Sequence, residues 1–343
     1  MRCRQPPPTV DLSERVDPGG LALNLASALI TILLAVSTLG VVAEAQSPRR
    51  PEVPRVGVIA TRAGYEAFQN GLRARFYTIG EDIVLEFRSA DRPGARLADV
   101  AAELVRMKVD VILAVGTPAV LAAKAATTTI PIVMLAADPI DSGIVADAAR
   151  PGGNVTGLSF NEQNTSAKRL ELLKEALPSA ARVAVLAAPN SVTPRMVRDT
   201  EAMARTLGVE IHTLPLQGPE TFDKAFTAIA ARRADSLIVL PAAAALANRA
   251  RIVTLTLKNK LPTMFWRRDF VDAGGLMSYG PDQAEMYKRA ADYVSKILQG
   301  AKPADLPIEQ PSKFELGLNL QTARTLGLTI PRAVLLQADH VIQ

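Results

Sequence analysis

Small and polar residues close several apolar segments of the sequence, and these positions are the ones that could bind a ligand. In the segment VGTPAV, 115–120, Gly116, Thr117 and Pro118 join an expected strand to an expected helix. With Thr117 as the N-cap and Pro118 as the first helical residue, the free N–H groups and the helix dipole favour an anion such as an α-carboxylate. The alternative is that Thr117 only caps its own helix.

Asp138 lies in LAADPI, 135–140, at the end of the next expected strand. Its carboxylate could pair with a ligand ammonium group. Asp before Pro also commonly opens a turn, so a purely structural role stays open. Thr61, Arg62 and Tyr65 follow the first expected strand and could reach the ligand from the same lobe.

The second half of the chain offers equivalent positions after its own strands, namely Asn190, Ser191, Pro241 and Ala242, with the aromatic residues Phe265, Trp266 and Tyr279. Trp266 is the only tryptophan, and its flat face could stack on an aromatic ligand or cover an alkyl one. The alternative is packing in the core or between lobes. Arg267 and Arg268 could form closing salt bridges or could be solvated.

Enzyme chemistry finds little support in the residues. The sequence has no G-x-x-x-x-G-K-[ST] phosphate loop and no G-x-S-x-G elbow. His212 and His340 have no partner pattern, which argues against a His-based triad or a metal site. No pair of acidic residues stands out by its spacing. We therefore predict a chain with no catalytic residues, no metal site and no cofactor.

The elements that position these residues are written twice. RVGVIA, 55–60, is echoed by RVAVLA, 182–187, and each opens the same series of helices and strands. Arg55 precedes Asp110 by 55 residues and Arg182 precedes Asp235 by 53, each aspartate standing just before a strand. Each copy then runs through an Ala-rich helix to a Pro that opens another strand. Chance similarity is the alternative, but matched order and spacing favour a duplicated architecture.

Strands alternating with helices predict an α/β fold of two similar lobes, each a doubly wound parallel sheet, joined by crossovers. Open sheets of this kind bind ligands beyond the carboxyl ends of their strands. PGGNVTG, 151–157, is Gly-rich enough to be one crossover, and a second is expected near 272–281. The expected boundaries are 46–155 with about 281–305 for lobe 1, and 156–280 with about 306–343 for lobe 2.

The first 45 residues have the pattern of a signal peptide. The stretch 21–43 carries no charge, follows three arginines and ends at Ala43-Glu44-Ala45, which predicts cleavage between Ala45 and Gln46. The alternative is an uncleaved membrane anchor, because about 20 residues can span a bilayer. The only cysteine, Cys3, precedes the apolar stretch, so the mature chain would contain no thiol. We expect export to the periplasm.

The formal net charge of +5 and a sequence pI near 9.4 raise the question of nucleic-acid binding. Lysines and arginines are spread thinly, and no run resembles a basic arm. We read the charge as favouring solubility, or a loose attraction to an anionic membrane surface, and we predict no nucleic-acid partner.

Several motifs carry a resemblance to a known family, among them RPGGNVTGLS, KRLELLKEALP, AGGLMSYGP and ADYVSKILQGAKPADLPIEQPSKFELGLNL. Together they resemble the exported solute-binding proteins of the tryptophan/tyrosine-type ABC transporter family, over about residues 53–342. The resemblance implies a type I periplasmic-binding fold with two lobes and three crossovers. It also implies capture of an amino acid or similar small molecule and delivery to a membrane permease driven by an ATPase.

These observations predict a monomeric receptor that holds a small solute, an amino acid or related carboxylate, between its lobes. In this interpretation the carboxylate lies at the helix start near Thr117 and the ligand side chain lies against Trp266 or Tyr279. The alternative is a periplasmic ligand sensor that signals through a partner protein, with the same fold and no transport.

Overall fold

The computed structural model describes residues 53–89, 96–160, 162–189 and 193–343. The chain divides into residues 1–52 and a compact unit of residues 53–343. The expected signal peptide and its cleavage site therefore lie outside the described residues, as do Asn190 and Ser191.

The first sheet has five parallel strands in the order β2-β1-β3-β4-β5. Their bounds are β1 Arg55–Ala60, β2 Val84–Ser89, β3 Val111–Val115, β4 Ile132–Ala136 and β5 Val155–Ser159. The inner strands β1, β3 and β4 are short, apolar and buried between helices, as expected for a parallel sheet covered on both faces, whereas the edge strand β2 carries Glu86 and Arg88.

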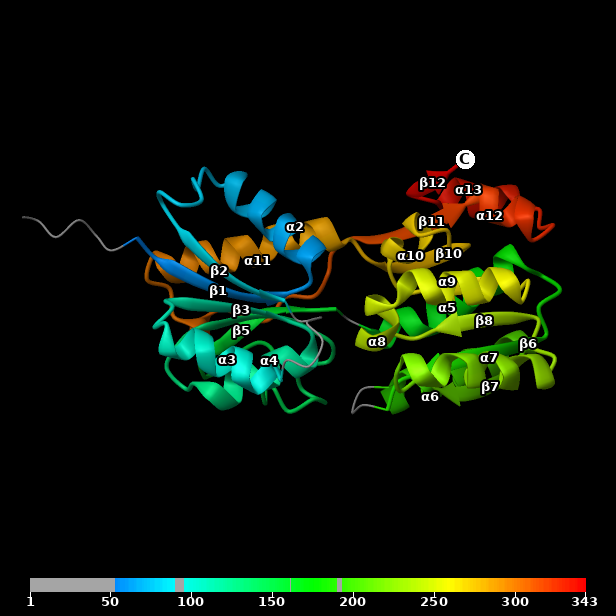
Figure 1. The fold of residues 1–343 in the computed structure, drawn as a ribbon, viewed down its shortest axis with the longest axis horizontal. Coiled ribbons are helices and arrows are strands. Elements are labelled where there is room, and N and C mark those ends of the chain that lie inside the picture. The colour runs from blue at the N-terminus through cyan, green and yellow to red at the C-terminus, as the bar shows by residue number, and fades with distance from the viewer. Residues whose placement is uncertain (1–52, 90–95, 161, 190–192) are drawn as a thin grey trace, which may run out of the picture. The chain divides into compact units, whose positions relative to one another are not determined.

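Four helices cover this sheet: α2 Arg62–Arg73, α3 Leu97–Arg106, α4 Thr117–Ala126 and α11 Gln283–Leu298. Helices α2 and α11 lie on one face and α3 and α4 on the other (Figure 1). Alternation along β1 explains this division, since Val56 and Val58 pack with Phe68 and Tyr287 while Ile59 packs with the opposite cluster. α11 comes from late in the chain, so two distant segments complete the first lobe.

The second sheet has seven strands in the order β12-β11-β10-β9-β8-β6-β7. Neighbouring strands run parallel except for β10 and β11, which are antiparallel. The bounds are β6 Arg182–Ala187, β7 Glu210–Pro215, β8 Ser236–Val239, β9 Thr263–Phe265, β10 Met277–Pro281, β11 Phe314–Asn319 and β12 His340–Ile342.

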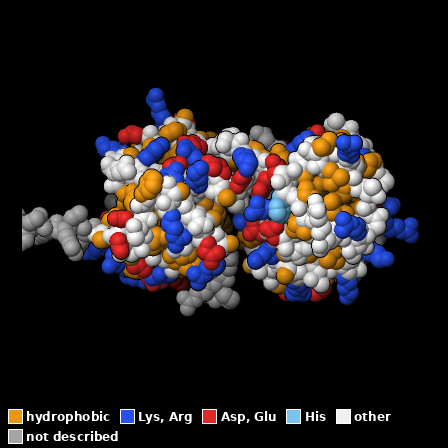
Figure 2. All heavy atoms as spheres, turned by 90° about the horizontal axis from the view of Figure 1, so that it is seen from above, with side chains coloured by type: hydrophobic (Ala, Val, Ile, Leu, Met, Phe, Trp, Pro, Cys, Tyr) orange, Lys and Arg blue, Asp and Glu red, His pale blue; other side chains and the backbone are white. Residues whose placement is uncertain are grey.

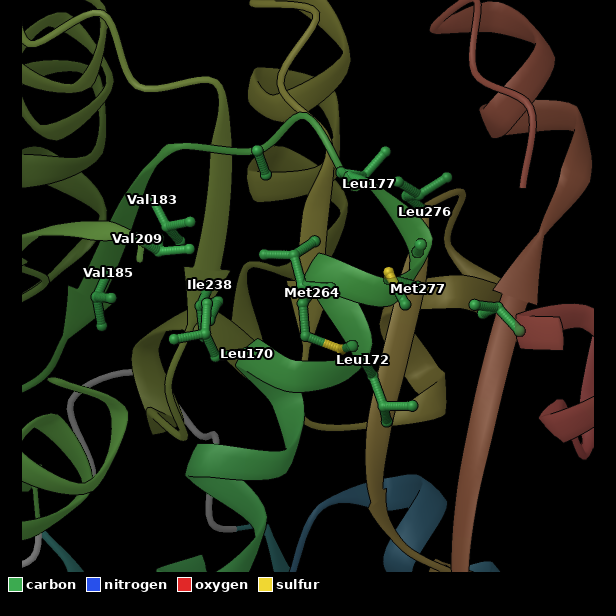
Figure 3. Packing of buried hydrophobic residues seen from close by; sticks show 14 of the residues in the cluster. Leu170, Leu172, Leu177, Val183, Val185, Val209, Ile238, Met264, Leu276 and Met277 are labelled. Atoms are coloured by element: carbon green, nitrogen blue, oxygen red, sulfur yellow. The ribbon is translucent and has the colours of Figure 1, made fainter. Parts of the chain in front are cut away.

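Helices cover both faces of this sheet as well. One face carries α5 Glu162–Ala176, α6 Thr193–Leu207, α12 Leu320–Thr325 and α13 Arg332–Gln337. The other carries α7 Phe222–Ala231, α8 Ala243–Ala247, α9 Arg249–Lys258 and α10 Arg268–Asp272. Short 3-10 turns occur at Pro219–Thr221 and Pro303–Asp305. On the first face, Leu170 and Leu172 of α5 pack with Ile238, Met264 and Met277 of three strands (Figure 3).

The chain passes three times between the two sheets: after β5, after β10, and ahead of β11. The sequence interpretation of 151–157 as a crossover was wrong, because Val155 and Thr156 pair with Ile132 and Val133 of β4. The first sheet therefore continues to Ser159, beyond the expected limit at 155. The returning segment also stays with this sheet, since Glu309 exchanges backbone hydrogen bonds with Gly157 and Ser159.

Candidate ligand-binding site

The carboxyl ends of β1, β3 and β4 bring the predicted residues of the first lobe to one edge. In the strand register Ile59 lies opposite Ala114, and Val115 lies opposite Leu135. The residues that follow, Thr61, Gly116 and Asp138, therefore emerge side by side from three neighbouring strands. This is the edge at which open α/β sheets bind their ligands.

Thr61 begins α2 as its N-cap. Its hydroxyl oxygen accepts a hydrogen bond from the backbone N–H of Gly64 at 3.1 Å. One turn later the half-buried ring of Tyr65 stacks on Phe87, with ring centroids 4.4 Å apart. The guanidinium group of Arg62 lies 5.0 Å from the centre of the same Phe87 ring. This cluster holds a flat aromatic surface near the end of β1.

The start of α4 differs from the expectation by one residue. Gly116 is the N-cap, with φ 93°, and Thr117 and Pro118 are the first two helical residues. A positive φ of this size suits glycine, because a Cβ would strain it. The N–H of Gly116 donates to the carbonyl of Leu135 at 2.7 Å, which ties the loop to β4.

Thr117 is therefore not the cap of its own helix. Its hydroxyl is half-buried and lies 3.4 Å from the carbonyl oxygen of Ala137, a long hydrogen bond. The first N–H groups of an α-helix have no acceptor within the helix and carry the positive end of its dipole. The hydroxyl and this helix start together favour a negatively charged group.

Of the two roles that the sequence left open for Asp138, the structure shows the turn role, and the pairing with a ligand ammonium group stays a prediction. Its backbone takes the left-handed conformation, with φ 39°, and its carbonyl accepts hydrogen bonds from the N–H and hydroxyl of Ser142 at 3.0 and 2.9 Å. Its side chain is 6 % exposed. A carboxylate at such a depth is costly to bury unless hydrogen bonds or charges compensate it.

In the second lobe, Pro241 follows β8 and is half-buried, and Ala242 is the N-cap of α8 and packs into the core. Trp266 is 5 % exposed and packs in the same cluster, tilted against Phe270 with ring centroids 4.6 Å apart. Phe265 stacks on Phe270 at 4.5 Å. These aromatic side chains therefore support the core.

Tyr279 is a partly accessible aromatic residue of this lobe. Its ring stacks on Phe314 of the antiparallel neighbour β11, with centroids 5.9 Å apart. Burial raises the pKa of its hydroxyl, so the phenol is neutral at physiological pH. A stacked, neutral phenol offers a ligand an apolar face.

The two arginines that follow Trp266 are held by local carboxylates. Arg267 pairs with Asp269 at 3.1 Å, and Arg268 lies 3.4 Å from Glu315 and 3.5 Å from Asp272. The sequence left open whether Arg267 and Arg268 form salt bridges that close the lobes or are solvated. In the structure both pair with carboxylates of their own lobe, so neither description fits.

Sequence reasoning missed Arg169. This arginine of α5 has no exposed surface, and its Nε–H donates to the carbonyl oxygen of Tyr279 at 2.8 Å. A signal existed in the motif KRLELLKEALP, because Arg169, Leu173 and Ala176 share one side of the helix by their spacing. A charged residue in that position points to a buried structural or functional role.

A cavity of about 160 Å³ lies where the chain crosses between the sheets, lined by Leu158, Asp282, Glu285, Met286, Arg289 and 309–313. Its charges pair with one another: Arg289 binds Glu309 through two nitrogens, and Lys313 binds Asp282 at 2.8 Å. Burial alone would raise the pKa values of Glu309 and Asp282, but the hydrogen bonds from Arg289 and Lys313 lower both overall. We call this charged group the crossover cluster.

Within the described part of the chain, no group of three or more His, Cys, Asp and Glu side chains is arranged to hold a metal ion. The same residues contain no helix that is both long and apolar enough to cross a bilayer. Basic and acidic side chains alternate over the face shown in Figure 2, without a continuous basic area there.

The chain is similar to a known protein family and to several known proteins. The profile of the family described as ABC transporter substrate binding protein matches residues 57–342. The "Tyrosine-binding protein" of Clostridioides difficile is 26% identical over 273 residues, which are 77% of this chain and 76% of that protein.

Two solved structures are also similar. The ABC domain from Streptococcus pneumoniae in complex with L-Trp has a TM-score of 0.78 and 26% identity, covering 84% of this chain and 99% of that one. A conserved domain protein from Vibrio cholerae has a TM-score of 0.77 and 26% identity, covering 84% and 100%. The predicted fold class, two α/β lobes of the type I periplasmic-binding kind, is confirmed.

Proposed function

We propose that this chain, which belongs to the family of ABC transporter substrate-binding proteins, captures an aromatic amino acid between its two lobes and delivers it to a membrane permease. The proposal extends to export through the N-terminal segment, a monomeric state, and an ATPase that drives the permease. It includes no catalytic turnover and no cofactor.

The observation that carries the proposal is the pairing of two chemistries at the ends of β3 and β4. The α4 start at Gly116 and Thr117 suits a carboxylate, and the buried carboxylate of Asp138 suits an ammonium group. A free α-amino acid carries both charges on one carbon. Two neighbouring loops of opposite preference therefore match its backbone.

The aromatic class is supported by relatives and by the surfaces near the strand ends. One relative is named for tyrosine binding, and a structural neighbour was solved with L-Trp. In this chain the stacked pairs Tyr65–Phe87 and Tyr279–Phe314 offer apolar rings, one in each lobe. Trp266 remains a predicted contact, although its indole packs in the core.

The remaining predicted contacts, Thr61, Pro118, Asn190, Ser191, Pro241 and Ala242, belong to the same proposal. In it, lobe 1 comprises the first sheet with α2, α3, α4 and α11, and lobe 2 comprises the second sheet with its helices. Binding would favour a closed arrangement of the lobes, which gives the permease a difference to recognise.

A thermal-shift screen of the purified chain against the amino acids and small carboxylates tests the proposal. A ligand present at about 100 times its dissociation constant adds roughly 2.7 kcal/mol to the stability, which raises the melting temperature measurably. We expect L-tyrosine or L-tryptophan to give the largest shift. A shift produced only by compounds without an α-amino group would contradict the aromatic amino acid proposal.

A further inference from the structure

We propose that Arg169 is a positioning residue, which fixes the middle of β10 beside the carboxyl end of β9 so that the second lobe presents its half of the binding site in the correct place. This inference rests on the proposed function, because it assigns a role in ligand affinity. It concerns a residue that does not itself contact the ligand in the proposed site.

Arg169 is fully buried. It is the largest side chain in the described part of the chain with less than 2 % of its surface exposed. It lies next to Leu170 and four residues before Leu173, both fully buried on the α5 face that packs on the sheet. Burying a guanidinium group is unfavourable unless hydrogen bonds compensate. The hydrogen-bond acceptors of Arg169 therefore indicate its role.

Arg169 binds the backbone of β10. Its Nε–H donates to the carbonyl oxygen of Tyr279 at 2.8 Å. Tyr279 is one residue past the Ser278–Phe265 pair of β10 and β9, so this bond acts in the middle of β10, where its pairing with β9 ends. α5 therefore contacts this part of the sheet through a charged hydrogen bond as well as through apolar packing.

The backbones of Gly280 and Trp266 are closely packed. A Cβ added at Gly280 would collide with the carbonyl oxygen of Trp266, and it would lie 3.7 Å from the Arg169 guanidinium. The backbones at 280 and 266 therefore approach more closely than any residue but glycine allows. Arg169 lies beside this contact, so its guanidinium sets the spacing of Tyr279, Gly280 and Trp266.

The consequence concerns the ring of Tyr279, which is a partly accessible aromatic residue of this lobe. The carbonyl bound by Arg169 belongs to the residue whose ring stacks on Phe314. Loss of the hydrogen bond would let the β10 backbone shift at Tyr279, and a displacement of about 1 Å in a binding site is enough to weaken a well-fitted ligand.

The test uses the full chain with Arg169→Met and Arg169→Lys, titrated calorimetrically with L-tyrosine. Trp266 is the only tryptophan, so selective excitation of the indole reports on the β9 end without any ligand. Leu173→Ala is the matched control, since Leu173 is fully buried one turn along the same helix. We expect Leu173→Ala to lower the melting temperature yet leave the dissociation constant within about twofold.

For Arg169→Met we expect the dissociation constant to rise by tenfold or more and the Trp266 emission to shift in the ligand-free chain. Arg169→Lys keeps the charge without the Nε–H, so it should also bind more weakly. Wild-type affinity and emission in a folded Arg169→Met chain would overturn the proposal. Full rescue by Arg169→Lys would overturn the role of the Nε hydrogen bond.

If Arg169→Met does not fold, Gly280→Ala displaces the same part of β10 from the end of β9 with Arg169 intact. It should produce the same emission shift and affinity loss. An unchanged emission in Gly280→Ala would also contradict the inference. If the wild-type chain binds no amino acid, the proposed function fails. The ligand-free emission still decides whether Arg169 positions β10 beside the end of β9.

Discussion

A carboxylate oxygen of Asp110 accepts a hydrogen bond from the backbone N–H of Arg55 at 2.7 Å, joining the residue before β3 to the first residue of β1. The second lobe repeats the arrangement, since Asp235 accepts the N–H groups of Arg182 at 3.0 Å and of Ala181 at 2.9 Å. The repeat seen in the sequence is therefore a repeat of one structural device. In both lobes it ties the starts of two neighbouring strands.

These anchors predict an order of stability losses. Asp110→Ala removes one hydrogen bond to an exposed backbone group and should cost about 1 kcal/mol. Asp235→Ala removes two such bonds and one from Ser236, so it should cost more. Urea unfolding of both variants checks the order, and equal losses would contradict it. Asp110→Asn, which keeps an acceptor oxygen, is the control.

Thr117→Ala should weaken ligand binding with little effect on folding. Gly116 is the N-cap of α4 and the Thr117 hydroxyl makes only a long bond to Ala137, so stability should change by less than about 0.5 kcal/mol. Loss of a ligand hydrogen bond should raise the dissociation constant by about five- to tenfold. Thr206→Ala is the control, because its exposed hydroxyl makes an equally long 3.4 Å bond within α6. Equal affinity of the Thr117 and Thr206 variants would remove Thr117 from the site.

Asp138→Asn tests the partner of the ligand ammonium group. A hydrogen bond to a charged group is worth about 1.5–3 kcal/mol, so the dissociation constant should rise by about tenfold or more. Asp147→Asn is a control from the same loop region, since Asp147 is exposed and its carboxylate accepts a hydrogen bond from the nearby N–H of Ala149. Calorimetric titration of both variants with L-tyrosine would show the difference. Retained affinity in Asp138→Asn would leave Asp138 with its turn role alone.

Trp266→Ala should unfold the second lobe more readily, because it empties a large volume beside Phe270 in the core. The expected loss is about 3–5 kcal/mol. Trp266→Phe keeps most of the ring volume and should retain both stability and binding. If Trp266→Phe stays folded but loses ligand affinity, the indole takes part in recognition beyond its packing. Unfolding curves and titrations of the two variants separate these outcomes.

The crossover cluster predicts an acid-dependent stability. The pKa of Glu309 is lowered by Arg289 below its ordinary 4.5, so the folded chain favours the ionised form. Its contribution is fully present above pH 4.5 and is lost as the pH falls through the lowered folded value. Glu309→Gln should therefore reduce stability at neutral pH and make little difference once the pH is below that folded value. Glu81→Gln, at an exposed position, should show no such trend. A constant gap between wild type and Glu309→Gln at all pH values would contradict the assignment.

The order of elements could be predicted from the sequence because the inner strands, such as β1, β3, β4 and β6, are short apolar runs that alternate with helical stretches. The repeat of Arg55 and Arg182 located both sheets. The boundary near 155 was misplaced because glycines 152 and 153 signal a break, whereas pairing with β4 depends on residues distant in sequence. β5 is the last strand before the first crossover, and its own sequence does not reveal its partner.

The site was predictable only in part. Residues that follow strand ends, such as Thr61, Gly116 and Asp138, could be placed because parallel strands end at a common edge. Side-chain direction could not, since Trp266 enters the core through contacts with Phe270, which the sequence does not specify. Arg169 escaped notice for the same reason, because its partner is a backbone carbonyl 110 residues away.

The most direct test of the central claim is a calorimetric titration of the purified chain with L-tyrosine, tyramine and 3-(4-hydroxyphenyl)propionate. Tyramine lacks the carboxylate meant for the α4 start, and the propionate lacks the ammonium meant for Asp138. We predict measurable binding of L-tyrosine and at least tenfold weaker binding of both analogues. If either analogue bound as tightly as L-tyrosine, the paired recognition of carboxylate and ammonium at the ends of β3 and β4 would be contradicted.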